Sequence, residues 1–131
     1  MDLEKLVEIA KEARQKAYAP YTHYTTGSAL LTKSGKIYTG CNIENDGIQS
    51  ICSERVAFIK ALSEGEREFE CLLVVGGPDD GELKFTTPCG YCRQFINEFV
   101  DDEFKVYAFH DTIDNIKTYT IRDLLPAVYK L

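Results

Sequence analysis

Two segments that contain cysteine constrain the fold of this chain most strongly. Residues 52–65, CSERVAFIKALSEG, place a thiol and a carboxylate two positions apart, ahead of apolar residues at helical spacing. Residues 88–100, PCGYCRQFINEFV, place two thiols three positions apart ahead of a second helical pattern. The sequence therefore predicts two helices that begin at cysteines. Helix N-termini carry partial positive charge, which lowers the pKa of a thiol and favours the thiolate that binds metal ions.

Three thiolates of this kind indicate zinc. A structural zinc site uses four protein ligands, whereas a catalytic site uses three and leaves a fourth position to water. Cys52, Cys89 and Cys92 are therefore the predicted ligands of one zinc ion per chain. Three thiolates around a divalent cation carry a net negative charge, which opposes the acidity of a bound water, and Arg55 could offset it by donating hydrogen bonds to the sulfurs. Glu54 is then placed to take the proton of the water.

Two other interpretations fit parts of this pattern. Cys89 and Cys92 alone also fit a thioredoxin-like redox pair, but such a pair requires neither a third thiol nor Glu54. A structural zinc site with Cys41 or Cys71 as the fourth ligand is a second alternative. Cys71 lies in a predicted buried strand, where a free cysteine is commonly a small core residue, whereas no such argument applies to Cys41.

The rest of the chain alternates between helix and strand patterns. Two strands joined by a turn at Ser34 and Gly35 predict an antiparallel hairpin and hence a mixed sheet. Strands that alternate with helices predict the α/β class, here a three-layer α/β/α sandwich with a five-stranded sheet covered on both faces. The expected elements are a helix over 3–18, two strands within 28–44, a strand over 69–77, a polar linker over 78–87, strands over 104–110 and 118–121, and a last helix that begins near Thr120 and is interrupted at Pro126.

Length and charge limit the classes of function. The 131 residues predict one catalytic domain over 1–131, and no apolar run is long enough to cross a bilayer. The net charge is −6 and the basic residues are dispersed, which disfavours nucleic acid or an anionic membrane as a partner and favours a small molecule. The first residues are charged and amphipathic, unlike a secretory signal, and five cysteines are an odd number. We expect a cytoplasmic protein with reduced thiols.

Four segments together resemble the small zinc-dependent cytidine deaminases over nearly the whole chain: AYAPYTHYTTGSALLTKSGKIYTGCNIEN, CSERVAFIKALSEG, TPCGYCRQ and LLPAVY. The resemblance implies hydrolytic deamination of cytidine or deoxycytidine at C4, which produces uridine or deoxyuridine and ammonia in pyrimidine salvage. It also implies that Glu54 deprotonates the water, protonates the ring N3 and passes a proton to the departing ammonia.

The same resemblance implies a nucleoside-binding set. Asn42 and Glu44 match the pair that hydrogen-bonds the ribose hydroxyls, and Tyr24 stands where an aromatic residue, usually Phe, packs beside the base. The backbone of Ser53 would meet O2 of the base, and the carbonyl of Thr87 would lie near the leaving ammonia.

Two further roles implied by the family lie outside direct contact with the base. Arg55 matches the residue that hydrogen-bonds the thiolates. Family members of this length are homotetramers with shared active sites, and Tyr129 occupies the place of a C-terminal aromatic that reaches into a neighbouring subunit. The resemblance therefore implies the same assembly for this chain.

The chain departs from the family pattern at several positions. The loop over 45–51 is one residue shorter than usual, and Ile48 replaces a tyrosine. Tyr91 and Ser53 each replace a residue that is usually alanine. The blasticidin S deaminases share the zinc elements and vary the same loop, so another aminopyrimidine nucleoside such as blasticidin S is the alternative substrate. A zinc-binding or redox module without catalytic activity is the remaining alternative.

Overall fold

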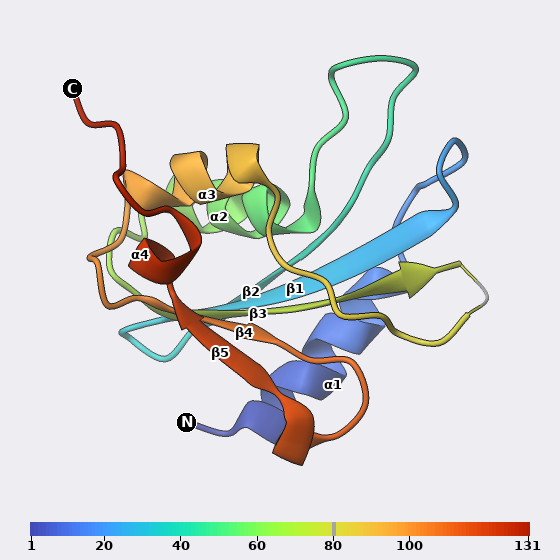
Figure 1. Ribbon diagram of the computed structural model, residues 1–131, viewed down its shortest axis with the longest axis horizontal. Coiled ribbons are helices and arrows are strands. Elements are labelled where there is room, and N and C mark those ends of the chain that lie inside the picture. The colour runs from blue at the N-terminus through green and yellow to red at the C-terminus, as the bar shows by residue number, and fades with distance from the viewer. Residues whose placement is uncertain (80) are drawn as a thin grey trace.

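The structure is a computed structural model that describes residues 1–79 and 81–131. Its helices surround one β-sheet (Figure 1). The elements are α1 (Leu3–Arg14), β1 (Tyr24–Thr32), β2 (Ile37–Cys41), α2 (Ser53–Ser63), β3 (Phe69–Pro78), α3 (Gly90–Asn97), β4 (Lys105–Ala108), the 3-10 helix η1 (Ile113–Asn115), β5 (Lys117–Thr120) and α4 (Ile121–Leu124). The strand order is β2-β1-β3-β4-β5. The β3/β4 pair is parallel and the other pairs are antiparallel, so the sheet is mixed.

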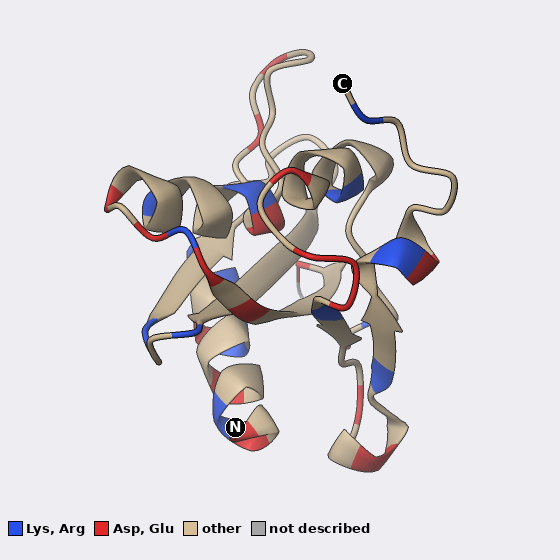
Figure 2. Cartoon of the chain, turned by 90° about the vertical axis from the view of Figure 1, so that its left-hand side faces the viewer, with Lys and Arg blue, Asp and Glu red and all other residues tan. Residues whose placement is uncertain are grey.

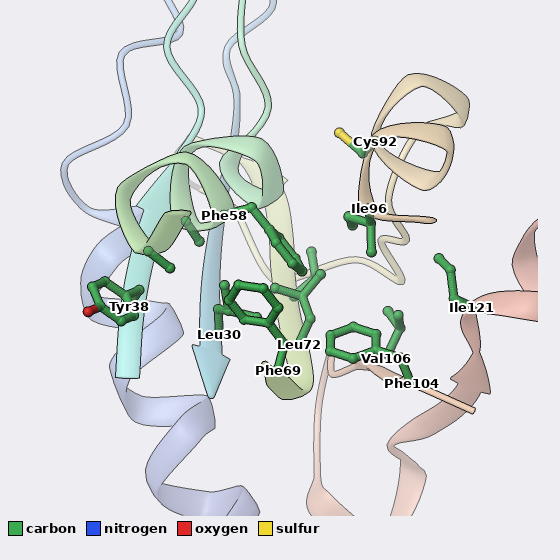
Figure 3. Close-up of a cluster of buried hydrophobic side chains, with 13 residues drawn as sticks. Leu30, Tyr38, Phe58, Phe69, Leu72, Cys92, Ile96, Phe104, Val106 and Ile121 are labelled. Carbon is green, nitrogen blue, oxygen red and sulfur yellow. The ribbon is translucent and has the colours of Figure 1, made fainter. Parts of the chain in front are cut away.

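Helices cover both faces of this sheet (Figure 1). On one face, α1 packs against strand residues in a buried cluster that includes Leu6, Val7, Ala10, Ala29, Leu73 and Val75. On the other face, α2 and α3 pack in a second cluster, drawn in Figure 3, that includes Leu30, Phe58, Leu72, Ile96 and Val106. Alternate residues along β1 and β3 belong to the two clusters, as the two-residue period of a strand requires. The predicted three-layer sandwich with a mixed five-stranded sheet is confirmed.

A close contact with β2 fixes the start of α2. A Cβ atom on Gly40 would lie 2.0 Å from the carbonyl oxygen of Ser53 and 2.7 Å from the backbone nitrogen of Ala57. Only a residue without a side chain allows the helix to lie this close to the strand. The close approach sets the position of the first turn of α2, which carries Ser53 and Glu54.

The helix predicted over 3–18 ends earlier, at Arg14. The backbone then leaves the helix to pair with the segment after β2, where Tyr18 N donates to Asn42 O (3.0 Å) and Glu44 N donates to Tyr18 O (2.8 Å). The backbone N–H groups of residues 15–17 still donate to carbonyl groups three residues back, but the long-range hydrogen bonds of Tyr18 take the chain out of the helix, and no local pattern reveals them. The prediction for residues 15–18 was wrong for that reason.

The remaining differences lie at the ends of elements. β1 starts at Tyr24, ahead of the predicted segment, because it pairs with β3 as far as Pro78. The last helix has the predicted cap, in which Thr120 and Asp123 exchange hydrogen bonds, but it comprises only Ile121–Leu124. In the predicted linker over 78–87, Asp80 lies outside the described residues, and Lys84 N donates to Gly76 O (2.7 Å). None of the helices in the described part of the chain is both long and apolar enough to span a membrane.

Candidate metal centre and substrate pocket

The two predicted cysteine segments meet where α2 and α3 begin. Cys52 is the N-cap residue of α2 and Cys89 is the N-cap residue of α3, with Cys92 in the first turn of α3. The Cys52 and Cys89 sulfurs are 3.7 Å apart, the Cys89 and Cys92 sulfurs are 3.4 Å apart, and all three lie within 4.8 Å of one another. Figure 3 shows Cys92 at the edge of the buried cluster, its sulfur directed from α3 toward α2. Packing between α2 and α3 thus holds the three thiols together.

The spacing of the sulfurs fits zinc. A tetrahedral zinc ion with Zn–S bonds of about 2.3 Å requires sulfurs about 3.8 Å apart. Within residues 1–79 and 81–131, these three cysteines form the only group of at least three potential metal-ligating residues. Cys41 is outside the group, and Cys71 is buried in the cluster on the α1 face of the sheet. The alternative of a fourth cysteine ligand is therefore wrong, and one position remains for a non-protein ligand.

The charges of the three sulfurs also require a cation. The pKa of the Cys52 thiol is lowered to about 5, first by a hydrogen bond from Cys92 and then by Arg55, against the opposing effect of burial. The same hydrogen bond, together with burial, raises the pKa of Cys92. The two thiols therefore share a proton, and ionising all three requires a positive ion among them.

Arg55 is positioned to add positive charge beside the sulfurs. Its Nη2 lies 3.8 Å from Cys52 Sγ, as predicted, and 3.4 Å from the carbonyl oxygen of Ser50. Its Nε is buried without a hydrogen-bond acceptor in the described part of the chain. An unpaired buried N–H group is costly, so this donor is available to a sulfur that carries full negative charge.

Glu54 is a buried carboxyl group beside the metal centre. The residue is 3% exposed, and burial raises the pKa of its carboxyl group, against the hydrogen bonds from its own backbone N–H and from Ser53. Ser53 Oγ donates to Glu54 Oε1 at 2.8 Å. Burial therefore favours the protonated form of Glu54 more than in an exposed carboxyl group, and a group that can both hold and accept a proton is what general acid–base catalysis requires.

A pocket of about 190 Å³ opens next to these residues. Six of the predicted site residues line it: Asn42, Glu44, Cys52, Glu54, Thr87 and Cys89. Four residues that were not predicted also line it: Thr26, Ser50, Ile51 and Thr86. The structure thus brings most of the predicted residues to one cavity.

The side chains of Asn42 and Glu44 already have partners within the chain. Asn42 accepts from Thr26 N and donates to the carbonyl oxygen of Tyr24, both at 2.9 Å. Glu44 Oε1 accepts from the backbone N–H groups of Tyr21 (2.9 Å) and Thr22 (3.1 Å), and Oε2 accepts from the Thr22 hydroxyl, whose hydrogen bond holds the pKa of Glu44 below its usual value. Each amide or carboxylate retains further hydrogen-bonding capacity toward the pocket.

Hydrogen bonds also hold the other walls of the pocket. The Tyr24 hydroxyl lies 2.6 Å from Thr86 Oγ1 and ties β1 to the segment before α3. Arg93 donates to Thr87 Oγ1 (3.1 Å) and to the carbonyl oxygen of Pro88 (2.7 Å), which fixes the approach to Cys89. Thr86 was missed in the sequence because its partner Tyr24 is distant along the chain, and Arg93 because it is also held by the distant carbonyl oxygen of Leu124, to which it donates at 3.0 Å.

Three predicted contact residues do not line this pocket: Tyr24 and Ser53 adjoin it through their hydrogen bonds to Thr86 and Glu54, whereas Tyr129 has no such link. It is 69% exposed, and its carbonyl oxygen accepts from Gln94 at 3.4 Å. Its role as a contact to a neighbouring subunit stays a prediction.

One signal in the sequence marks part of the missed wall. Tyr24, Thr26 and Ser28 occupy alternate positions of β1 and so share the face that carries Leu30 in the α2/α3 cluster. Ser28 is completely buried. On one face of this central strand, polar residues at alternate positions are followed by an apolar residue. This change indicates that the first part of the face lines a polar site and the later part lies in the core.

The fold and the three-thiolate centre define a zinc-binding α/β protein, and comparison with known proteins agrees. Residues 1–108 match the family described as the cytidine and deoxycytidylate deaminase zinc-binding region. A cytidine deaminase of Sporosarcina psychrophila is 43% identical over 98% of this chain and 92% of its own length. A blasticidin-S deaminase of Bacillus cereus is 33% identical over 98% of this chain and 91% of its own length.

A solved structure shows the same agreement in three dimensions. The crystal structure of cytidine deaminase from Burkholderia pseudomallei matches with a TM-score of 0.86 and 38% identity, covering 98% of this chain and all of the other. This chain belongs to the cytidine and deoxycytidylate deaminase family, whose matching region is described as zinc-binding, and Cys52, Cys89 and Cys92 form a cluster positioned to bind such an ion.

Proposed function

We propose that this protein hydrolyses cytidine and deoxycytidine to uridine or deoxyuridine and ammonia. The observation that carries the proposal is the trio of cysteine sulfurs, which leaves one ligand position of a tetrahedral metal open, next to the buried carboxyl group of Glu54. Family membership and the whole-chain relatives named cytidine deaminase support the same substrate. Residues 1–131 act as one catalytic domain in this proposal.

The residues of the chain have separate tasks in the reaction. Cys52, Cys89 and Cys92 hold zinc, which when bound supplies Lewis-acid activation of the attacking water. Glu54 takes a proton from that water and gives it to N3 of the base. Glu54 then carries the second proton of the water to the amino group that leaves C4 as ammonia, so that water and cytidine are converted to uridine and ammonia.

The other predicted residues bind the nucleoside. Asn42 and Glu44 contact the ribose hydroxyls with their remaining hydrogen-bonding capacity, and Tyr24 packs beside the base. The backbone N–H of Ser53 donates to O2 of the base, and the carbonyl oxygen of Thr87 accepts a hydrogen bond from the leaving amine. Their positions in or beside one pocket support these roles.

A small nucleoside also suits the charge of the molecule. The chain carries a net charge of −6, and Figure 2 shows acidic and basic residues interspersed over helices, strands and loops. A polynucleotide substrate requires basic side chains that follow its phosphates. The charge pattern therefore favours a nucleoside over a nucleic acid as the substrate.

We further propose a homotetramer with shared active sites, located in the cytoplasm and acting in pyrimidine salvage. Tyr129 is exposed and lies outside the pocket of its own chain, as a residue that serves a neighbouring pocket would. Ile48 is fully exposed on the loop between β2 and α2, which projects from the body of the chain (Figure 1). Burial of these apolar side chains between subunits would stabilise the assembly.

Blasticidin S is the second candidate substrate, favoured by the 33% identity to the Bacillus cereus enzyme. A single experiment separates the candidates: absorbance assays with cytidine, deoxycytidine and blasticidin S, and zinc analysis on the same sample. We expect turnover of the first two with one zinc per chain. No turnover of either nucleoside would contradict the main proposal.

The role of the carboxyl group is tested by Glu54→Gln. This variant should lose at least about 100-fold in kcat, the contribution typical of a general acid–base group, and should retain zinc. Glu12→Gln, at an exposed position of α1, is the matched control and should keep full activity. A zinc-binding module without catalysis would show no difference between the two variants.

A further inference from the structure

Two buried serines are linked to the carboxyl group of Glu54. Ser28 in β1 and Ser53 at the start of α2 have no exposed surface. Their hydroxyl oxygens are 2.7 Å apart, and Ser53 Oγ lies 2.8 Å from Glu54 Oε1. The three side chains therefore form a continuous hydrogen-bonded chain from the sheet to the buried carboxyl group.

The direction of these hydrogen bonds follows from the number of protons. A carboxylate can only accept, so Ser53 donates its single hydroxyl proton to Glu54. Ser53 then has no proton left for Ser28, and Ser28 must donate to Ser53. Ser28 thus holds the Ser53 hydroxyl in the orientation that points its proton at Oε1.

The packing of β2 makes room for this chain. Gly40 is the residue of β2 paired with Ser28, and its missing side chain lets the backbone of Ser53 approach the sheet. One hydrogen bond between two serines uses only one of their two hydroxyl protons, and Oε1 of Glu54 accepts the other. The additional bond to Oε1 is what connects them to Glu54.

The arrangement distinguishes the two oxygens of Glu54. Oε1 accepts a hydrogen bond from the Ser53 hydroxyl, whereas Oε2 has no hydrogen bond to another side chain in the described residues. A carboxyl proton on Oε1 would face the proton that Ser53 donates. A carboxyl group held in this way carries its proton on Oε2 and keeps Oε1 as the acceptor.

We propose that Ser53, oriented by Ser28, is a positioning residue for deamination that holds Glu54 Oε1 so that Oε2 moves the proton. The inference rests on the proposed function. Ser53 keeps its own proton throughout, and only the proton that passes from the water to the nucleoside changes place. Because Ser53 contributes one hydrogen bond and moves no proton itself, its effect should be several-fold, well below that of Glu54.

Three variants separate positioning from stability. Ser53→Ala should lower kcat about fivefold with KM unchanged, as expected for one lost hydrogen bond, and should lower the unfolding temperature because the Ser28 hydroxyl is left unpartnered. In Ser28→Ala/Ser53→Ala the orphaned hydroxyl is gone, so the unfolding temperature should recover while kcat stays low. Ser28→Ala alone should lower kcat about twofold, because Ser53 still donates but is held less firmly.

A matched control is Thr32→Val, which removes a buried hydroxyl at the turn of the hairpin, far from Glu54. It should lower the unfolding temperature without changing kcat. If kcat recovers together with the unfolding temperature in the double variant, or if Ser53→Ala keeps the kcat of the unmodified protein, the positioning role is wrong.

Crystal structures of the unmodified protein and Ser53→Ala provide a readout that does not depend on turnover. We expect the Glu54 carboxyl group to have one orientation in the unmodified protein and more than one in Ser53→Ala. An unchanged single orientation would overturn the inference. If the unmodified protein deaminates none of the tested nucleosides, the proposed function fails, and the orientation of Glu54 in the two crystals still decides the role of Ser53.

Discussion

The guanidinium group of Arg55 lies over the ring of Tyr91, with Cζ 4.1 Å from the ring centroid. The same group reaches Cys52 with Nη2, 3.8 Å from Sγ. Tyr91 is 66% exposed and lies between the two cysteines of α3, so its ring covers Arg55 on the solvent side of the metal centre. Tyr91 thus adds a cation–π contact to Arg55, which donates to the Cys52 sulfur.

Substitution of Arg55 should weaken zinc binding strongly, and substitution of Tyr91 should weaken it less. Arg55→Gln should raise the zinc dissociation constant at least about tenfold, the effect typical of a residue that hydrogen-bonds a metal ligand. Tyr91→Ala should raise it about two- to fivefold because it removes only the stacking contact, and Tyr91→Phe should keep the affinity. Competition with a chromophoric chelator measures all three constants. Equal affinities for Arg55→Gln and the unmodified protein would show that the arginine does not support the centre.

The identity of the ligands is tested by single serine variants. Cys89→Ser should reduce bound zinc from one per chain toward zero and lower the unfolding temperature, because a ligand that binds only the folded chain stabilises it. Cys41→Ser should retain one zinc, since Cys41 lies outside the sulfur cluster. Metal analysis and thermal unfolding on the same preparations check both. Zinc loss in Cys41→Ser would restore the alternative of a fourth cysteine ligand.

The lowered pKa of Cys52 predicts an unusual pH dependence for alkylation of the zinc-free chain. A thiol with a pKa of about 5 is mostly thiolate at neutral pH and loses the reactive anion only as the pH falls toward 5. The rate for Cys52 with iodoacetamide should therefore change less than about twofold between pH 6 and pH 8.

Cys41 is the internal control for this measurement. Burial raises the pKa of its thiol, so its rate should keep rising with pH through the same range. Peptide mapping by mass spectrometry separates the two cysteines. A rate for Cys52 that rises about tenfold for each pH unit would mean that its thiol titrates like an ordinary one.

The metal centre and the order of elements could be predicted because their signals are local. Cys52 and Cys89 each stand directly before a helical pattern, and both are N-cap residues in the structure. Strand patterns and the turn at Gly35, whose φ is +96°, likewise depend on residues close together in sequence. Spacing along the chain was enough for these features.

The walls of the pocket could not be predicted because they depend on partners distant in sequence. Thr86 enters the site through a hydrogen bond with Tyr24, and the Ser28–Ser53 contact joins β1 to α2. The unpredicted end of α1 has the same origin, since Tyr18 pairs with the segment after β2. The sequence around a polar strand residue is the same whether its side chain contacts solvent or a hydroxyl group from a distant segment, so local patterns cannot distinguish the two cases.

The contact between Tyr24 and Thr86 predicts a selective effect on substrate binding. Tyr24→Phe keeps the ring beside the pocket and removes the hydroxyl that holds Thr86 in its wall. We expect KM for cytidine to rise about two- to fivefold with little change in kcat, as for one lost hydrogen bond. Tyr119→Phe, on the far edge strand β5, is the control and should change neither constant. An equal KM for Tyr24→Phe and the unmodified protein would show that the hydroxyl does not shape the pocket.

Two glycines should separate the stability of the sheet from the integrity of the metal centre. A Cβ on Gly40 would lie 2.0 Å from the Ser53 carbonyl oxygen in α2, and a Cβ on Gly27 would lie 2.1 Å from the Ala10 carbonyl oxygen in α1. Each alanine variant forces a helix away from the sheet, which should reduce the free energy of unfolding by about 1–3 kcal/mol. Denaturant unfolding measures this loss.

Only the Gly40 contact involves the helix that carries Cys52 at its start and Glu54 in its first turn. Gly40→Ala should therefore also lower zinc affinity and kcat in protein that remains folded, whereas Gly27→Ala, which displaces α1 on the opposite face, should leave both near their original values. Zinc titration and kinetics at a temperature well below both unfolding transitions provide the comparison. Similar losses of kcat in the two variants would mean that the activity depends on the stability of the whole sheet. The contact between α2 and β2 would then not be what aligns Glu54 with the three sulfurs.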